Sequence, residues 1–122
     1  MNRLTMFTAI PKAVKRRVWE RDHGRCILCG SVRGAAPNAH FIARSQLGLG
    51  IDERNIVTLC MACHTDYDNS AKRKQIREQI RNYLKGIYGD DWEEGKLVYK
   101  KWMDYKEVTF NAEDYDDWEL DE

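Results

Sequence analysis

The fold of this chain depends on three short sequences: CILC at residues 26–29, AHFIARS at 39–45 and NIVTLCMACH at 55–64. Two CxxC pairs contain every cysteine of the 122-residue chain, namely Cys26, Cys29, Cys60 and Cys63. Four soft ligands from two places in the chain form the set that tetrahedral zinc prefers. A thiol redox protein is the alternative, but it predicts one active pair in a βαβ setting, and no such alternation occurs here. We therefore predict one structural zinc ion shared by both pairs.

The length of the chain corresponds to one domain, and a domain this small gains stability from a bound metal. No apolar run approaches the ~20 residues that cross a bilayer, and the N-terminus lacks the sections of a signal peptide. We expect a cytoplasmic protein without membrane contact. In that reducing compartment, paired CxxC motifs indicate metal sites rather than disulfides.

Charge is distributed unevenly along the chain. The 20 basic and 20 acidic residues balance, but residues 111–122 carry seven acidic residues and no basic one. Residues 1–110 therefore hold 20 basic against 13 acidic residues, a net charge of +7. A basic body with an acidic tail suggests contact with nucleic acid, and a solvated surface with a flexible tail is the alternative.

Hydrophobic periodicity predicts an α+β fold in a single domain, residues 1–110, followed by a flexible tail at 111–122. Residues 1–9 show no clear period. Val14 and Val18 predict a helix at about 11–22, which Pro11 can begin. The β-branched run at 55–59 predicts a strand that pairs with a short strand at 39–43, and a helix follows at about 61–68.

Two further helices are expected after this core of about residues 24–70. Apolar residues recur at four-, three- and four-residue steps and predict a helix at about 71–85: Ile76, Ile80, Tyr83, Leu84 and Ile87. A helix at about 91–106, beginning near Asp90 or Asp91, would place Trp92 and Trp102 against the core or a neighbouring helix.

The residues between and after the cysteine pairs resemble the HNH endonucleases. The resemblance rests on AHFIARS at 39–45, on Asn55 and on Cys63 with His64, and it covers about residues 10–70 by motif. The sequence is most similar to small phage-type members with a zinc-clamped core. The resemblance implies a ββα-metal (HNH) core with a two-knuckle, four-cysteine zinc site, flanked by an N-terminal helix and one or two C-terminal helices.

The resemblance also implies a divalent-metal-dependent endonuclease that nicks or cuts double-stranded DNA in a bacterial or phage-infected cell. Other phage packaging or recombination proteins are the implied partners, and the oligomeric state is left open. His40 would be the general base, because imidazole titrates near neutral pH and can take a proton from water. Asn55 would hold the loop between the strands and orient His40. His64 would bind the catalytic Mg²⁺ or Mn²⁺.

Asp68 lies four residues after His64, on the same helical face, and is either a second ligand of that ion or a helix-end cap. Many members of the family place a metal-binding Asp or His directly before the general base, whereas this chain has Ala39 there. A non-catalytic zinc module that binds DNA or a protein is therefore the alternative function.

Basic residues outside the core are candidates for phosphate contact. Lys and Arg on helices neutralise phosphates without reading base sequence, so we expect weak sequence preference. Arg44 follows the first strand and offers forked donors to a phosphate. The helix at 71–85 adds Lys72, Arg73 and Arg77, for which a solvated face is the alternative.

Overall fold

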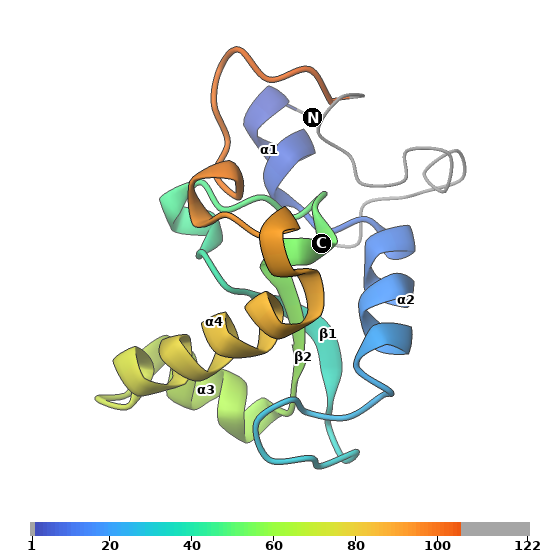
Figure 1. Ribbon diagram of the computed structural model, residues 1–122, viewed down its shortest axis with the longest axis vertical. Helices are drawn as coiled ribbons and strands as arrows, with labels where there is room; N and C mark the ends of the chain where they lie inside the picture. Colours follow the sequence, from blue (N-terminus) through green and yellow to red (C-terminus); the bar gives the residue numbers. More distant parts are fainter. Residues whose placement is uncertain (1, 106–122) are drawn as a thin grey trace.

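The computed structural model describes residues 2–105, which form an α+β fold with four α-helices and one two-stranded antiparallel sheet (Figure 1). The elements in chain order are α1 (Arg3–Thr8), α2 (Lys12–Arg21), β1 (Ala36–His40), β2 (Ile56–Leu59), α3 (Met61–Asn69) and α4 (Arg73–Tyr88). Short 3-10 turns lie at Arg44–Gln46, Glu53–Asn55, Gly89–Asp91 and Glu94–Lys96. None of the helices in residues 2–105 combines the length and apolar character that crossing a membrane requires. The expected acidic tail at 111–122 lies outside the described residues.

The sheet consists of β1 and β2, with His40 opposite Ile56 and Ala36 opposite Leu59. The prediction of a strand at 39–43 was wrong, because the strand lies at 36–40. After it the backbone leaves the ladder: the Ile42 N–H donates to the side-chain oxygen of Asn55, 2.9 Å away, instead of to a strand carbonyl. The return strand predicted at 55–59 is confirmed as Ile56–Leu59.

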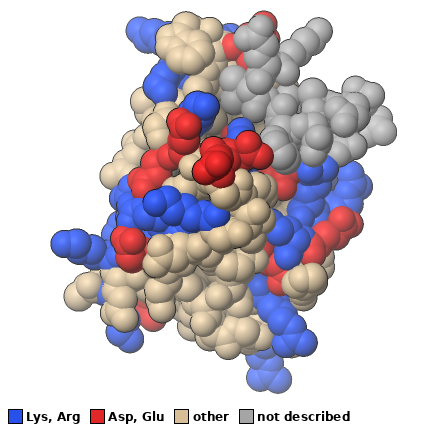
Figure 2. All heavy atoms as spheres, in the orientation of Figure 1, with Lys and Arg blue, Asp and Glu red and all other residues tan. Residues whose placement is uncertain are grey.

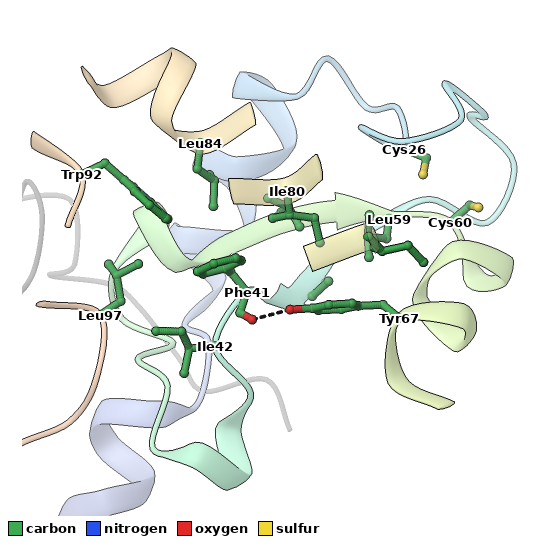
Figure 3. Close-up of a cluster of buried hydrophobic side chains, with 13 residues drawn as sticks. Cys26, Phe41, Ile42, Leu59, Cys60, Tyr67, Ile80, Leu84, Trp92 and Leu97 are labelled. Atoms are coloured by element: carbon green, nitrogen blue, oxygen red, sulfur yellow. Dashed lines mark hydrogen bonds between the residues drawn. The ribbon is translucent and has the colours of Figure 1, made fainter. Parts of the chain in front are cut away.

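Helices cover the sheet from two sides, with α2 on one side and α3 and α4 on the other (Figure 1). Val14 and Val18 of α2 pack on Ile56 of β2, as their four-residue spacing predicts. The main core joins both strands to α3 and α4 (Figure 3). Its fully buried centre includes Phe41, whose ring lies 5.4 Å from that of Trp92.

The helices predicted at 11–22, 61–68 and 71–85 are confirmed as α2, α3 and α4, although α4 continues to Tyr88. The helix predicted at 91–106 was wrong over residues 91–104. Here the backbone bonds to a distant loop: Leu49 N–H donates to Leu97 O at 2.8 Å, and Tyr99 N–H donates to Leu47 O at 2.7 Å. These bonds use groups that a helix would need for itself.

The helix α1 was not predicted. Its six residues are too few for a detectable hydrophobic period, and Asn2 caps it by accepting from the Thr5 N–H at 2.8 Å. Phe7 anchors it in a small separate cluster with Leu49, Ile51 and Met103. Tertiary contact therefore holds a helix that would not persist alone.

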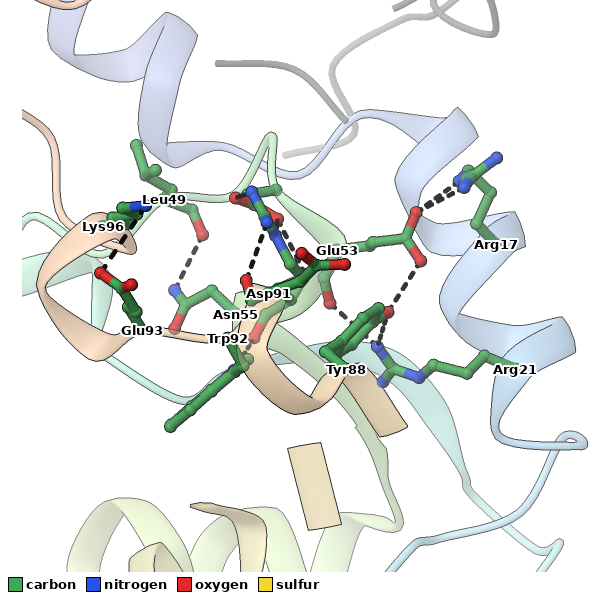
Figure 4. Close-up of polar contacts among 12 residues, drawn as sticks. Arg17, Arg21, Leu49, Glu53, Asn55, Tyr88, Asp91, Trp92, Glu93 and Lys96 are labelled. Atoms are coloured by element: carbon green, nitrogen blue, oxygen red, sulfur yellow. Dashed lines mark hydrogen bonds and ion pairs between the residues drawn. The ribbon is translucent and has the colours of Figure 1, made fainter. Parts of the chain in front are cut away.

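A buried carboxylate, Asp22, joins α2 to the sheet and to α4. Its side chain is fully buried and accepts from the Thr58 N–H at 2.9 Å, from the Tyr83 hydroxyl and from Arg21 at 2.8 Å. Arg21 also reaches the Ile56 carbonyl at 2.7 Å and the Tyr88 hydroxyl at 3.0 Å (Figure 4). Burial and this hydrogen bond to Asp22 raise the pKa of Tyr83 to about 12.

We expect Asp22→Ala to lower the free energy of unfolding by about 3 kcal/mol or more, because the buried Arg21 would lose its counter-charge. Urea denaturation followed by circular dichroism measures this difference. Glu20→Ala, at an exposed position on the same helix, is the control and should change stability by less than about 0.5 kcal/mol. If Asp22→Ala lowers the free energy of unfolding by as little as the control does, Asp22 does not join α2 to the sheet and α4 in the way described.

Candidate functional site

The four cysteines converge at one end of the sheet. Their sulfur atoms all lie within 4.8 Å of one another, and the Cys29 and Cys60 sulfurs are 3.6 Å apart. A tetrahedral zinc ion with Zn–S bonds of about 2.3 Å needs sulfurs about 3.8 Å apart. The arrangement therefore fits one tetrahedral metal ion. It joins the loop after α2, which carries Cys26, to the first turn of α3 beyond Cys60 (Figure 3).

Backbone N–H groups point at the sulfurs of Cys26 and Cys60. The Cys63 N–H lies 3.4 Å from the Cys60 sulfur, which caps α3. Burial opposes ionisation of Cys26, but nearby backbone N–H groups, chiefly those of Cys29 and Cys60, outweigh it and lower the pKa of Cys26 to about 7. Burial and the neighbouring sulfurs raise the pKa of Cys63. Four thiolates this close therefore need a cation among them.

The three residues expected to form the catalytic site lie on β1, before β2 and on α3. His40 ends β1, and its Nε2 lies 2.8 Å from the Thr8 carbonyl oxygen at the end of α1. Burial lowers the pKa of His40 below its ordinary value of 6.5, and the charges of Arg44 and His64 lower it further, against the opposing effect of the Thr8 carbonyl. The imidazole is therefore neutral at pH 7.

Asn55 is fully buried and holds the loop between the strands, as expected from the sequence. Besides accepting from Ile42, its amide donates to the Ile42 carbonyl at 3.2 Å and to the Leu49 carbonyl at 2.8 Å (Figure 4). Its own backbone carbonyl accepts from the Phe41 N–H at 2.7 Å. These bonds determine where the chain turns directly after His40.

His64 and Asp68 lie together on α3, with 3.5 Å between His64 Nε2 and Asp68 Oδ2. Both line an open cavity of about 200 Å³ between β1 and α3. Gly34, Ala36, Asn38, Leu59, Met61 and Thr65 complete its lining. The cavity thus places an imidazole and a carboxylate where a small cation can reach both.

The basic residues expected to bind nucleic acid differ in their surroundings. Arg44 is exposed and donates to the Thr8 hydroxyl at 3.2 Å, so Thr8 connects it to His40. Lys72 is exposed. Arg73, in contrast, lies 4.9 Å over the Tyr67 ring and donates to the Tyr67 carbonyl at 3.0 Å.

Arg77 stacks 5.3 Å over the Phe41 ring and lies 4.0 Å from Glu94. Arg73 and Arg77 therefore also have structural contacts inside the molecule. In the view of Figure 2, Lys and Arg gather over α2, and a second basic group lies over α4 beside acidic residues.

Two features of the site were missed by sequence reasoning. Thr8 lies in a segment without periodicity, and its role becomes visible only when α1 packs on the loop at Gly50. That packing requires glycine, since a Cβ on Gly50 would lie 2.3 Å from the Thr8 carbonyl oxygen. The second feature is Asn38, which lines the cavity of His64. The sequence feature that could have identified Asn38 is its position directly before Ala39-His40-Phe41.

The fold and the site define an α+β protein with a cluster of four cysteines that could hold a metal ion. No family model and no solved structure matches the chain. A protein of Nostoc sp. named Anaredoxin is 32% identical over 56 residues, which cover 46% of this chain and 72% of that protein. The chain belongs to the same family as this Nostoc protein.

We expect Cys63→Ser to lose the bound metal, because one of four thiolate ligands is removed. Elemental analysis of purified protein should find one metal ion per chain in the wild type and well below one in the variant. The variant should be less stable by about 3 kcal/mol or more, the stabilisation that a ligand supplies at about 100 times its Kd. Met61→Ser, inside the same CxxC pair but 76% exposed, is the control and should keep its metal.

Proposed function

We propose that this protein is an HNH-type endonuclease that hydrolyses phosphodiester bonds of double-stranded DNA with a divalent metal ion. The observation that carries the proposal is the pair of His64 and Asp68 on α3 beside the cavity, with His40 at the end of β1, two residues after the cavity-lining Asn38. A phosphodiester hydrolase needs an activated water and a cation beside the scissile phosphate. These residues can supply both.

His40 acts as the general base. The Thr8 carbonyl can only accept a hydrogen bond, so the imidazole carries its proton on Nε2 and presents an unprotonated Nδ1. That nitrogen takes the proton from water as the water attacks phosphorus. The lowered pKa of His40 keeps it in the neutral form at pH 7.

His64 and Asp68 hold the catalytic divalent ion, Mg²⁺ or Mn²⁺. A nitrogen and a carboxylate oxygen, 3.5 Å apart beside a cavity, fit such an ion with water completing its shell. When bound, the ion acts as a Lewis acid on the phosphate and stabilises the leaving oxygen. Asn55 positions His40 through the loop that it holds.

The cysteine cluster is proposed to hold structural zinc, which stabilises the start of α3 and hence the position of His64. DNA contact is proposed for Arg44, beside His40, and for Lys72, with Arg73 and Arg77 contributing charge from α4. The phage and bacterial context, with packaging or recombination proteins as partners, follows from the resemblance alone and is part of the proposal.

A redox protein is the second candidate, favoured by the name of the Nostoc relative and by the four-sulfur site. Tetrahedral sulfur ligands suit iron as well as zinc. A cluster of several irons would hold its cysteine sulfurs farther apart, so sulfurs within 4.8 Å fit a single iron ion. Bound iron would give a coloured protein whose absorbance changes on reduction, whereas zinc gives neither.

We expect purified protein to nick supercoiled plasmid in the presence of Mg²⁺ or Mn²⁺, and His40→Ala to slow nicking by about 10²-fold or more. Gel separation of nicked, linear and supercoiled plasmid measures the rate. His23→Ala changes an exposed histidine in the loop after α2 and should leave the rate unchanged. DNA binding without metal-dependent cleavage would instead establish the non-catalytic zinc module suggested by Ala39.

The pH dependence of nicking follows from the lowered pKa of His40. The base is active when unprotonated, so the rate should be level above pH 6.5 and fall as the pH drops through the lowered pKa. Rates at saturating metal between about pH 5.5 and 8, with DNA binding measured at each pH, test this. A midpoint above 6.5 would be inconsistent with His40 as the base.

A further inference from the structure

The strand β1 carries one extra residue just before His40. Ala36 pairs with Leu59 and Ala39 with Val57, so three steps on β1 face two steps on β2. Pro37 lies within this irregularity and has no N–H to give to the ladder. Such bulges are common beside active sites, where they change the direction of a side chain.

The bulge leaves Asn38 on the face of β1 opposite to the core. Ala39 is fully buried and packs in the main core, whereas Asn38 is exposed and lines the cavity of His64 and Asp68. His40 lies two residues farther along the strand, hence on the same face as Asn38. Ala39 is buried in the core and has no side-chain ligand atom, so Asn38 is the cavity-lining residue of β1 whose side chain can bind an ion.

The chemistry around the cavity is that of a hard cation. It presents the His64 nitrogen and the Asp68 carboxylate from α3, 3.5 Å apart, and the Asn38 amide from β1. Among the described residues the Asn38 side chain has no hydrogen-bond partner, so its carbonyl oxygen can serve as a ligand. Carboxylate, amide oxygen and water are the ligands that Mg²⁺ and Mn²⁺ prefer, and imidazole nitrogen adds a preference for Mn²⁺.

We propose that Asn38 is a third protein ligand, through Oδ1, of the divalent ion held by His64 and Asp68. This inference rests on the proposed function, whose catalytic ion it describes further. Asn38 is uncharged, so the three protein ligands carry a single negative charge and leave the site with net positive charge toward a phosphate. The ligand on β1 also places the ion between the strand that carries the base and α3.

The test measures Mn²⁺ binding directly, without DNA and without cleavage. The full chain, with its cysteine site loaded with zinc, is titrated with Mn²⁺, and the free ion is followed by its electron paramagnetic resonance signal. We expect one Mn²⁺ per chain in this second site, a Kd about tenfold higher for Asn38→Ala, and a lower Kd for Asn38→Asp. Asn82→Ala, at an exposed position on α4, is the matched control and should bind as the wild type does.

Two results would overturn the inference, and they differ in what they mean for the proposed function. A Kd for Asn38→Ala within about twofold of the wild type would remove Asn38 from the site while leaving the His64–Asp68 ion in place. If the wild-type protein binds no Mn²⁺ other than at the cysteine site, both the Asn38 inference and the proposed catalytic ion are overturned. The Asn38→Asp variant guards against misfolding, since damage to the fold cannot tighten binding.

Discussion

The approach of four cysteine sulfurs to within 4.8 Å of one another is the constraint on which the rest of the structure depends. Four thiolates repel each other, so a cation bound among them would turn an unfavourable contact into a stabilising cross-link. The cysteine cluster joins the loop after α2 to the first turn of α3. The Ile27 N–H adds a connection to the sheet by donating to the Thr58 carbonyl of β2 at 3.0 Å. His64 lies in the first turn of α3, directly after Cys63 of the cluster. Its distance from β1 is therefore set by the cysteine cluster together with the core contacts of Tyr67 on the same helix.

A second set of bonds holds the other half of the candidate site. The buried amide of Asn55 bonds to Ile42 and Leu49, and so replaces the ladder that β1 loses after His40. The Thr8 carbonyl, which lies outside the sheet, accepts a hydrogen bond from the His40 imidazole. The two histidines are thus positioned by different means: His64 follows the cysteine pair at the start of α3, whereas His40 bonds to the Thr8 carbonyl and precedes the loop that the Asn55 amide holds. A cation bound by His64 and Asp68 would lie in the cavity between α3 and β1, the strand that carries His40.

Much of this arrangement could be predicted from local sequence. The spacing of Cys26 to Cys63 predicted their convergence, and the apolar period predicted α2 and α4, because both signals act over a few residues or a few turns. The strand β1 was placed three residues too late, since Phe41 and Ile42 look like a strand but pack as core residues after it. The helix expected at 91–106 was wrong over 91–104 because Leu97 and Tyr99 bond to the distant loop at 47–49. No local sequence pattern predicts a backbone pairing between segments that are so far apart in the chain.

By itself, the sequence determined the four-cysteine cluster, the α+β class and the order of the site residues along the chain. These depend on residue type and spacing, which are properties of a short segment. Only the tertiary structure decided that Thr8 contacts His40, that Arg77 stacks on Phe41 and that Asn38 rather than Ala39 faces the cavity. Each of these depends on which groups meet when helices and strands pack, and on one extra residue in β1. Packing of distant segments, not local preference, decides such contacts.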